Sequence, residues 1–149
     1  MIHHTSIVVR YAETDQMGIV HHSVYPIWYE VARTELIRQI GISYTQMEAM
    51  GVMTPLVELK CRYKGVTRYE DQLTIHSWVS KLSPASVEFT YEVYREGEKV
   101  PCNVGYTLHA WVDAASFRPI NMKKRYPEIY SSIEKLAEPR STANQSFGG

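Results

Sequence analysis

The order of helical and strand patterns is the feature that most constrains how this chain folds. Residues 24–40 carry a wide apolar stripe at helical spacing, with Ser23 before it as a natural N-cap and Gly41 after it as a terminator. Four later segments alternate apolar and polar residues as half-buried strands do, and they cover 57–63, 72–82, 87–93 and 100–112. The simplest packing lays the helix across the concave face of a curved antiparallel sheet.

Three shorter patterns complete the predicted order of elements. A first strand is expected at residues 5–11, a short helix at 44–50 and a terminal helix at about 126–136. Turn residues at 84–85 and 97–98 join the last three strands as an antiparallel meander. The pattern therefore predicts an α+β fold with a five-stranded antiparallel sheet.

The length and composition favour one domain without bulk attraction to polyanions. A chain of 149 residues fits a single domain, which we expect at 1–137, and the polar, small-residue-rich stretch 138–149 is typical of a flexible tail. The formal net charge is zero, so nucleic acid and anionic membranes are not expected partners, whereas self-association is plausible. The sequence shows neither an export signal nor a long apolar run, which predicts a cytoplasmic protein without membrane insertion.

The loop between the first strand and the long helix carries the most suggestive chemistry. Asp15 lies in it, and Gly18 permits a tight bend or the close approach of a ligand. The loop leads into a helix N-terminus, whose free N–H groups and dipole stabilise negative charge. A carboxylate beside such an oxyanion site suits acyl transfer, but an aspartate before a helix is more often a turn or cap residue.

A resemblance favours the catalytic interpretation. Residues 11–41, YAETDQMGIVHHSVYPIWYEVARTELIRQIG, closely resemble the signature of the 4-hydroxybenzoyl-CoA thioesterase and YbgC-like acyl-CoA thioesterases. The shared elements are the T-D-x-M-G-x-V-H-H stretch, the aromatic helix start around Tyr25 and the E-x-A-R-T-E run from Glu30 to Glu35. The likeness covers roughly residues 5–124 and implies the hotdog fold, in which the sheet wraps around a long central helix.

The resemblance also implies a reaction and its residues. The family's catalytic aspartate falls on Asp15, an aromatic residue on Tyr11 and a histidine on His22, whose backbone N–H is offered to the thioester carbonyl. Gly18 and Tyr25 are expected to contact the substrate. The implied reaction hydrolyses an acyl-CoA to a carboxylic acid and CoA without a metal or redox cofactor. The acyl group, and the choice between nucleophile and general base for Asp15, stay open.

Basic residues are expected along one rim of such a site, because the nucleotide end of CoA carries phosphates. The candidates, each of which can equally be a solvated surface residue, are Arg62, Lys64, Arg68, Arg118, Lys123 and Lys124. Family members usually form dimers or tetramers, so the resemblance further implies a homodimer or homotetramer with sites at subunit interfaces.

Other reactive side chains suggest structural roles. Cys61 and Cys102 alternate in phase with apolar neighbours and are expected to be small buried hydrophobes, because nothing beside them indicates an activated thiolate. The histidines lack a helical H-x-x-x-H spacing, so no metal site is predicted. His76 and His109, which lie in strand patterns, are expected to be structural.

Alternatives to acyl-CoA hydrolysis remain on the sequence alone. An enzyme acting on acyl carrier protein would need a basic docking patch, which zero net charge disfavours. A hotdog protein that binds an acyl thioester without cleaving it has no need of Asp15 beside an oxyanion site. A dehydratase would use a histidine and an acidic partner in different motifs, which are absent here.

Overall fold

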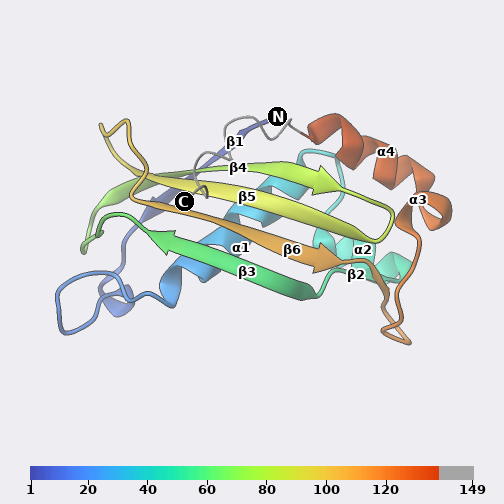
Figure 1. The fold of residues 1–149 in the computed structure, drawn as a ribbon, viewed down its shortest axis with the longest axis horizontal. Helices are drawn as coiled ribbons and strands as arrows, with labels where there is room; N and C mark the ends of the chain where they lie inside the picture. The colour runs from blue at the N-terminus through green and yellow to red at the C-terminus, as the bar shows by residue number, and fades with distance from the viewer. Residues whose placement is uncertain (138–149) are drawn as a thin grey trace.

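The computed structural model describes residues 1–137, within which five antiparallel strands form one sheet (Figure 1). The spatial order is β1-β4-β5-β6-β3, so β1 and β3 are the two edges. The strands span His3–Val8 (β1), Leu56–Tyr63 (β3), Gln72–Leu82 (β4), Ser86–Arg95 (β5) and Asn103–Ala110 (β6). The predicted tail at 138–149 lies outside the described residues, and the domain boundary at 137 stays a prediction.

Helix α1 (Val24–Arg38) crosses one face of this sheet, and their contact forms the core (Figure 1). Tyr29, which is fully buried on α1, stacks on Tyr91 of β5 with ring centroids 4.2 Å apart and planes 2° apart. Gly105 of β6 makes this approach possible, because a Cβ there would lie 2.5 Å from the Tyr29 hydroxyl and from the Lys60 carbonyl. The predicted helix across an antiparallel sheet is therefore confirmed.

Shorter elements close the ends of the sheet. A 3₁₀ turn, η1, follows β1, and a two-stranded ladder of β2 and β7 lies beside α2. Their bounds, with those of the last two helices, are Tyr11–Glu13 (η1), Tyr44–Met50 (α2), Val52–Met53 (β2), Val112–Asp113 (β7), Met122–Arg125 (α3) and Pro127–Leu136 (α4). The Ser43 side chain caps α2, and Gly51 ends it with a φ of 103°, as a left-handed C-cap glycine does.

The predicted strand at 100–112 is wrong in its bounds and in its inward face. It begins at Asn103 and breaks at Trp111, beyond which β7 pairs with β2. The residues of β6 that face α1 are not its apolar set, because Asn103 accepts a hydrogen bond from the Tyr29 hydroxyl and Gly105 lies against the same ring. Alternation then turns Val104 to the opposite face. Hydrogen bonds to side chains of α1 and β5 satisfy the buried polar groups on this face of β6. Periodicity alone does not reveal such partners.

Two smaller boundaries also differ from the sequence prediction. The first strand ends at Val8 instead of residue 11, because the chain turns into η1, and α1 ends at Arg38 instead of residue 40.

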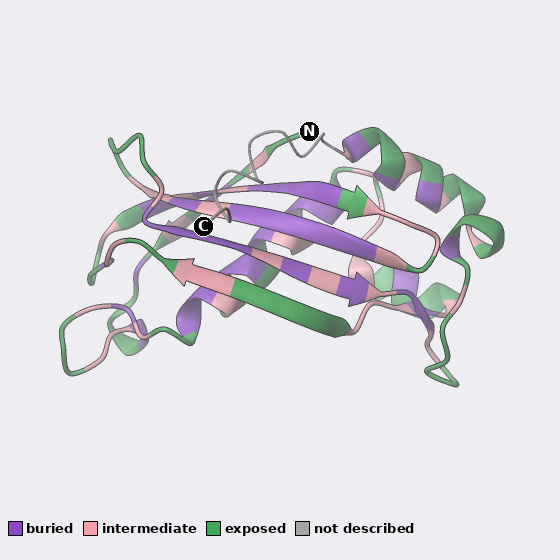
Figure 2. Cartoon of the chain, in the orientation of Figure 1, coloured by how far each residue is buried: buried purple, intermediate pink, exposed green. Residues whose placement is uncertain are grey.

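Strand β3 was expected to bury one apolar face, yet Val57 is 63% exposed and Leu59 38% exposed (Figure 2). The apolar face of this edge strand is therefore left open by the single chain.

Candidate active site

A tight loop places Asp15 at the start of α1. The Asp15 N–H donates to the Ile19 carbonyl at 2.9 Å, and the Gly18 N–H donates to the Asp15 carbonyl at 2.9 Å. Gly18 has a φ of +76°, which a residue with a side chain rarely adopts. A bridge between Thr14 and Val20 closes the base of the loop. The bend predicted at Gly18 is therefore present, and it fixes where the Asp15 backbone lies.

Glu13 ties this loop to the helix. Its carboxylate, only 7% exposed, accepts hydrogen bonds from the Arg10 N–H at 2.8 Å and from the Trp28 indole N–H at 2.9 Å. Its backbone carbonyl accepts the N–H of His21 at 3.0 Å. Burial raises the pKa of Glu13, but the hydrogen bonds outweigh it and leave that pKa below its ordinary value. Glu13 is thus a charged anchor between β1, the loop and α1.

The Asp15 side chain makes one hydrogen bond within residues 1–137. Its Oδ1 accepts the Met17 N–H at 2.8 Å, which holds the carboxylate in an Asx-type turn. The second carboxylate oxygen has no hydrogen-bond partner in the described part of the chain. The turn role and the catalytic role are therefore compatible, because the turn uses one oxygen and leaves the other available.

The N-terminus of α1 is not capped by a side chain. Ser23 occupies the N-cap position but makes no capping hydrogen bond, and its hydroxyl instead lies 2.7 Å from Nδ1 of His21. The predicted N-cap role of Ser23 is therefore wrong as far as its side chain is concerned. The His22 N–H has no acceptor among the described residues. A helix start with an unused N–H can stabilise an oxyanion.

A pocket of about 180 Å³ joins these groups, and we call it the Asp15 pocket. Its walls are mostly apolar. They are formed by Asp15, Met17, Ile19, Val20, His22, Tyr25, Tyr63, Gly65 and Val66. Tyr25 and Tyr63 meet edge to face at 5.4 Å, and the Tyr25 hydroxyl is hydrogen-bonded to Thr67 at 2.8 Å. The Tyr63 hydroxyl donates to the His22 carbonyl at 2.6 Å. The end of β3 therefore fixes the helix start at which His22 lies.

The structure brings together some of the predicted site residues but not all. Asp15, His22 and Tyr25 line the same pocket, and Gly18 lies at the tip of its loop. Tyr11 is 76% exposed, packs edge to face on Tyr69 at 5.6 Å and does not line the pocket. A catalytic role for Tyr11 has no geometric support within one chain and stays a prediction.

The basic candidates also lie outside the pocket walls. Lys64 directly precedes the pocket residue Gly65, and Arg68 lies in the loop that follows. Arg62, on β3, alternates with Cys61 and Tyr63 and so faces away from α1. Arg118 lies between β7 and α3, and Lys123 and Lys124 lie on α3, at the opposite end of the sheet from the Asp15 loop (Figure 1).

Sequence reasoning missed three residues that shape the site. Trp28 lies in the core as part of the apolar stripe of α1, and its indole N–H also anchors Glu13. No sequence pattern singled out Glu13 or Tyr63, because the hydrogen bonds of Glu13 with Trp28 and of Tyr63 with His22 cannot be inferred from spacing. An acidic residue two positions before a candidate catalytic aspartate is a hint that could have singled out Glu13.

The cysteines and histidines provide no competing centre. Cys102 is buried, and burial raises the pKa of its thiol, which opposes a thiolate nucleophile. Cys61 lies 3.4 Å from the Tyr29 hydroxyl and 3.3 Å from the Asn103 amide. In the described part of the chain no group of three or more His, Cys, Asp or Glu residues is arranged to hold a metal ion. No described helix is both long and apolar enough to cross a membrane.

The model of the thioesterase-like superfamily matches residues 9–135. The chain belongs to this superfamily. A putative acyl-CoA thioesterase, YneP of Bacillus subtilis, is 37% identical over 129 residues, which are 87% of this chain and 93% of that protein. The acyl-CoA thioester hydrolase YbgC of Escherichia coli O157:H7 is 28% identical over 116 residues, 78% of this chain and 86% of its own length.

A solved thioesterase-like structure agrees in fold. The 1,4-dihydroxy-2-naphthoyl-CoA (DHNA-CoA) thioesterase of Staphylococcus aureus superposes with a TM-score of 0.85 at 32% identity, covering 99% of this chain and 95% of that one. The predicted likeness to YbgC-like thioesterases, the hotdog fold and the assignment as a thioester hydrolase are confirmed. The individual site residues stay predictions.

Proposed function

We propose that this thioesterase hydrolyses acyl-CoA esters in the Asp15 pocket, with Asp15 as the catalytic carboxylate. The observation that carries the proposal is the common wall of that pocket. It holds a carboxylate with one unused oxygen and, at the uncapped start of α1, His22 with an unused backbone N–H. These are the two groups that thioester hydrolysis needs, namely one to attack or activate water and one to hold the oxyanion.

The reaction then follows from the positions of these groups. The thioester carbonyl oxygen accepts a hydrogen bond from the His22 N–H, which would contribute about 3–4 kcal/mol if it acts as a typical oxyanion donor. Asp15 either attacks the carbonyl carbon to give a mixed anhydride that water later cleaves, or removes a proton from water as it attacks. In both routes the C–S bond breaks, the thiolate of CoA leaves and takes up a proton, and a carboxylic acid is released.

The walls of the pocket favour an apolar acyl group. Tyr25 and Tyr63 present aromatic rings, and Met17, Ile19 and Val66 add aliphatic surface. The acyl carbons gain from leaving water, and aromatic acyl groups can pack against the tyrosine rings. Lys64 and Arg68 are the proposed contacts for the CoA phosphates, because both are exposed and follow the pocket strand β3. No metal or redox cofactor is required in this scheme.

A second copy of the chain is proposed to complete the site. Strand β3 has a free edge and exposes Leu56, Val57, Leu59 and Tyr63, each at least 38% exposed (Figure 2). An open edge with apolar side chains is a surface that proteins usually cover. Because Tyr63 belongs both to this edge and to the Asp15 pocket, an interface here would lie beside the pocket. A homodimer or homotetramer with sites at subunit interfaces, in the cytoplasm, remains the proposed form.

The deciding experiment measures CoA release from benzoyl-CoA, a short-chain acyl-CoA and palmitoyl-CoA with a thiol reagent. Asp15→Asn keeps the size of the side chain and removes its charge, so kcat/KM should fall about a hundredfold or more. The matched control, Glu96→Gln, removes an exposed carboxylate from the β5–β6 hairpin and should behave as wild type.

Each outcome of this assay decides between specific alternatives. A folded Asp15→Asn protein with wild-type kcat/KM would refute the assigned role. If wild type releases no thiol from any CoA ester but hydrolyses an ester of acyl carrier protein, the carrier-protein alternative replaces the proposal. A wild type inactive on both kinds of ester favours a binder without turnover.

A further inference from the structure

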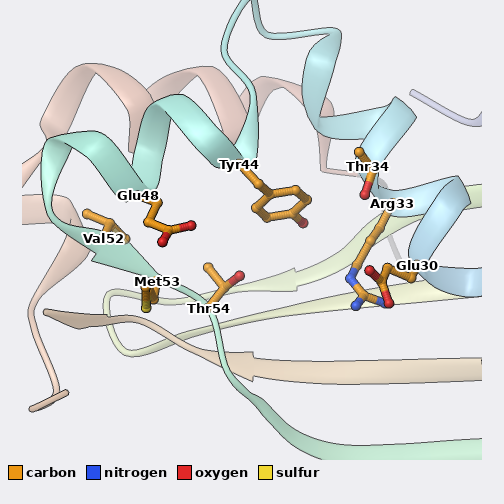
Figure 3. A pocket seen from close by; sticks show the side chains of 8 residues that line it. All are labelled: Glu30, Arg33, Thr34, Tyr44, Glu48, Val52, Met53 and Thr54. Atoms are coloured by element: carbon orange, nitrogen blue, oxygen red, sulfur yellow. The ribbon is translucent and has the colours of Figure 1, made fainter. Parts of the chain in front are cut away.

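A second cavity, which we call the Arg33 cavity, lies between the later part of α1 and the segment that carries α2 and β2 (Figure 3). Its volume is about 250 Å³. Its walls are formed by Glu30, Arg33, Thr34, Tyr44, Glu48, Val52, Met53 and Thr54. None of these residues lines the Asp15 pocket. Tyr25 and Arg33 are eight residues apart on α1, which separates the two cavities by roughly 12 Å along the helix.

Arg33 is the chemically distinctive residue of this cavity. It is partly buried, and its side chain extends from α1 toward the space below Tyr44 (Figure 3). Its positive charge acts on the phenols of Tyr44 and Tyr91, which places the guanidinium close to both hydroxyls. No carboxylate lies within 4.0 Å of it among residues 1–137. A guanidinium has five N–H donors, so contact with two phenol oxygens leaves donors available to a ligand.

A buried polar network runs beside Arg33, from Tyr91 to the wall residue Thr54. The Tyr91 hydroxyl lies 2.6 Å from Oγ1 of Thr107, which in turn lies 2.9 Å from Nε2 of His109. Nδ1 of His109 lies 3.0 Å from the carbonyl of the wall residue Thr54. Burial and the charge of Arg33 lower the pKa of His109 to about 4, so the imidazole is neutral near pH 7. Arg33 is thus the only cationic side chain among the residues that line the cavity.

The rest of the lining limits what this cation can bind. Tyr44, Val52 and Met53 provide apolar surface, while Glu30 and Glu48 are exposed carboxylates of the lining, and Glu30 is drawn beside Arg33 in Figure 3. These two carboxylates repel a phosphate or another polyanion more strongly than a ligand with one charge. A ligand with one carboxylate and a compact apolar body can accept hydrogen bonds from the guanidinium while it brings in only one negative charge.

We propose that the Arg33 cavity binds a small monocarboxylate, with its carboxylate on the Arg33 guanidinium and its apolar part against Tyr44, Val52 and Met53. Benzoate is a suitable probe, since it has one negative charge and a flat apolar ring. The reaction proposed above releases a carboxylic acid, so this cavity would bind the chemical class of its product. That link rests on the proposed function, whereas the binding itself does not.

The test is titration of the full chain with benzoate, followed by amide NMR shifts and by calorimetry. Wild type should show saturable binding, with the largest shifts at residues 30–34 and 44–54. Arg33→Gln should weaken binding about tenfold or more, since it removes a charged hydrogen-bond partner. Glu48→Gln should strengthen binding severalfold, because it removes a repelling charge. Asp15→Asn should leave shifts in this cavity unchanged, and inorganic phosphate should produce none.

Three results would overturn the proposal. They are no saturable shift up to about 10 mM benzoate, unchanged affinity in a folded Arg33→Gln protein, or shifts confined to residues 15–25. If Arg33→Gln does not fold, Tyr44→Ala removes part of the apolar wall in its place, and unchanged affinity would then count against the site. Thiol release by wild type is measured separately, so failure of benzoate binding leaves the hydrolase proposal untouched, and inactivity on CoA esters leaves the binding result valid.

Discussion

The two cavities along α1 differ in the groups that they offer to stabilise negative charge. At the Asp15 pocket the helix start offers an uncapped His22 N–H, a dipole without a formal positive charge beside it. In the Arg33 cavity the formal positive charge of Arg33 lies close to the hydroxyls of Tyr44 and Tyr91. Dipoles suit charge that develops during a reaction, whereas a fixed cation suits charge that a ligand already carries. One helix therefore presents a site suited to catalysis and a site suited to binding.

The largest expected effect concerns the fixed network of the Arg33 cavity. His109 has a pKa of about 4 in the folded chain against an ordinary 6.5, so unfolding takes up a proton between these values. The contribution of His109 to the free energy of unfolding should be fully present above pH 6.5. The free energy of unfolding should then fall by about 3 kcal/mol as the pH drops from 6.5 to 4. Urea unfolding across this range measures the slope. His109→Gln, whose amide can keep both hydrogen bonds, should flatten it, and an unaltered slope would exclude His109 as its source.

The next effect concerns the anchor of the Asp15 loop. Glu13→Ala removes the acceptor for the Arg10 N–H and the Trp28 indole, so the loop should lose its fixed position relative to α1. We expect kcat/KM to fall about thirtyfold, mainly through kcat, because misplacement of a reacting group is costly. Glu13→Gln should recover part of the loss. Benzoate affinity of the Arg33 cavity should be unchanged, and a parallel loss there would indicate a general defect in folding.

A smaller effect should separate stability from catalysis at the helix start. Ser23→Asp places a capping carboxylate where the present side chain makes no cap, which should stabilise the chain by about 0.5–1 kcal/mol. The same negative charge opposes an oxyanion at the His22 N–H, so kcat should fall about tenfold. Thermal unfolding and thiol release measure the two quantities. Faster turnover in the variant would contradict the assigned oxyanion position.

The sequence was sufficient for the fold and for the loop, but not for the walls of the site. Period-two and helical patterns predicted the sheet and α1, because burial of one face dominates both, and Gly18 pointed to the bend. The contacts of Tyr63 with His22 and of Glu13 with Trp28 join residues 41 and 15 positions apart, and no local pattern encodes such pairs. The inward polar face of β6 escaped prediction because its partners lie on α1 and β5.

Gly105 helps to keep the Asp15 pocket and the Arg33 cavity separate. Tyr25, Tyr29 and Arg33 follow one another at intervals of four along α1, so the Tyr29 ring stands between the two cavities. With Gly105 and Tyr91 against it, that ring has no room to rotate aside. The packed ring is therefore a barrier between the Asp15 pocket and the Arg33 cavity. A smaller residue at position 29 would open a passage and turn two compartments into one elongated chamber.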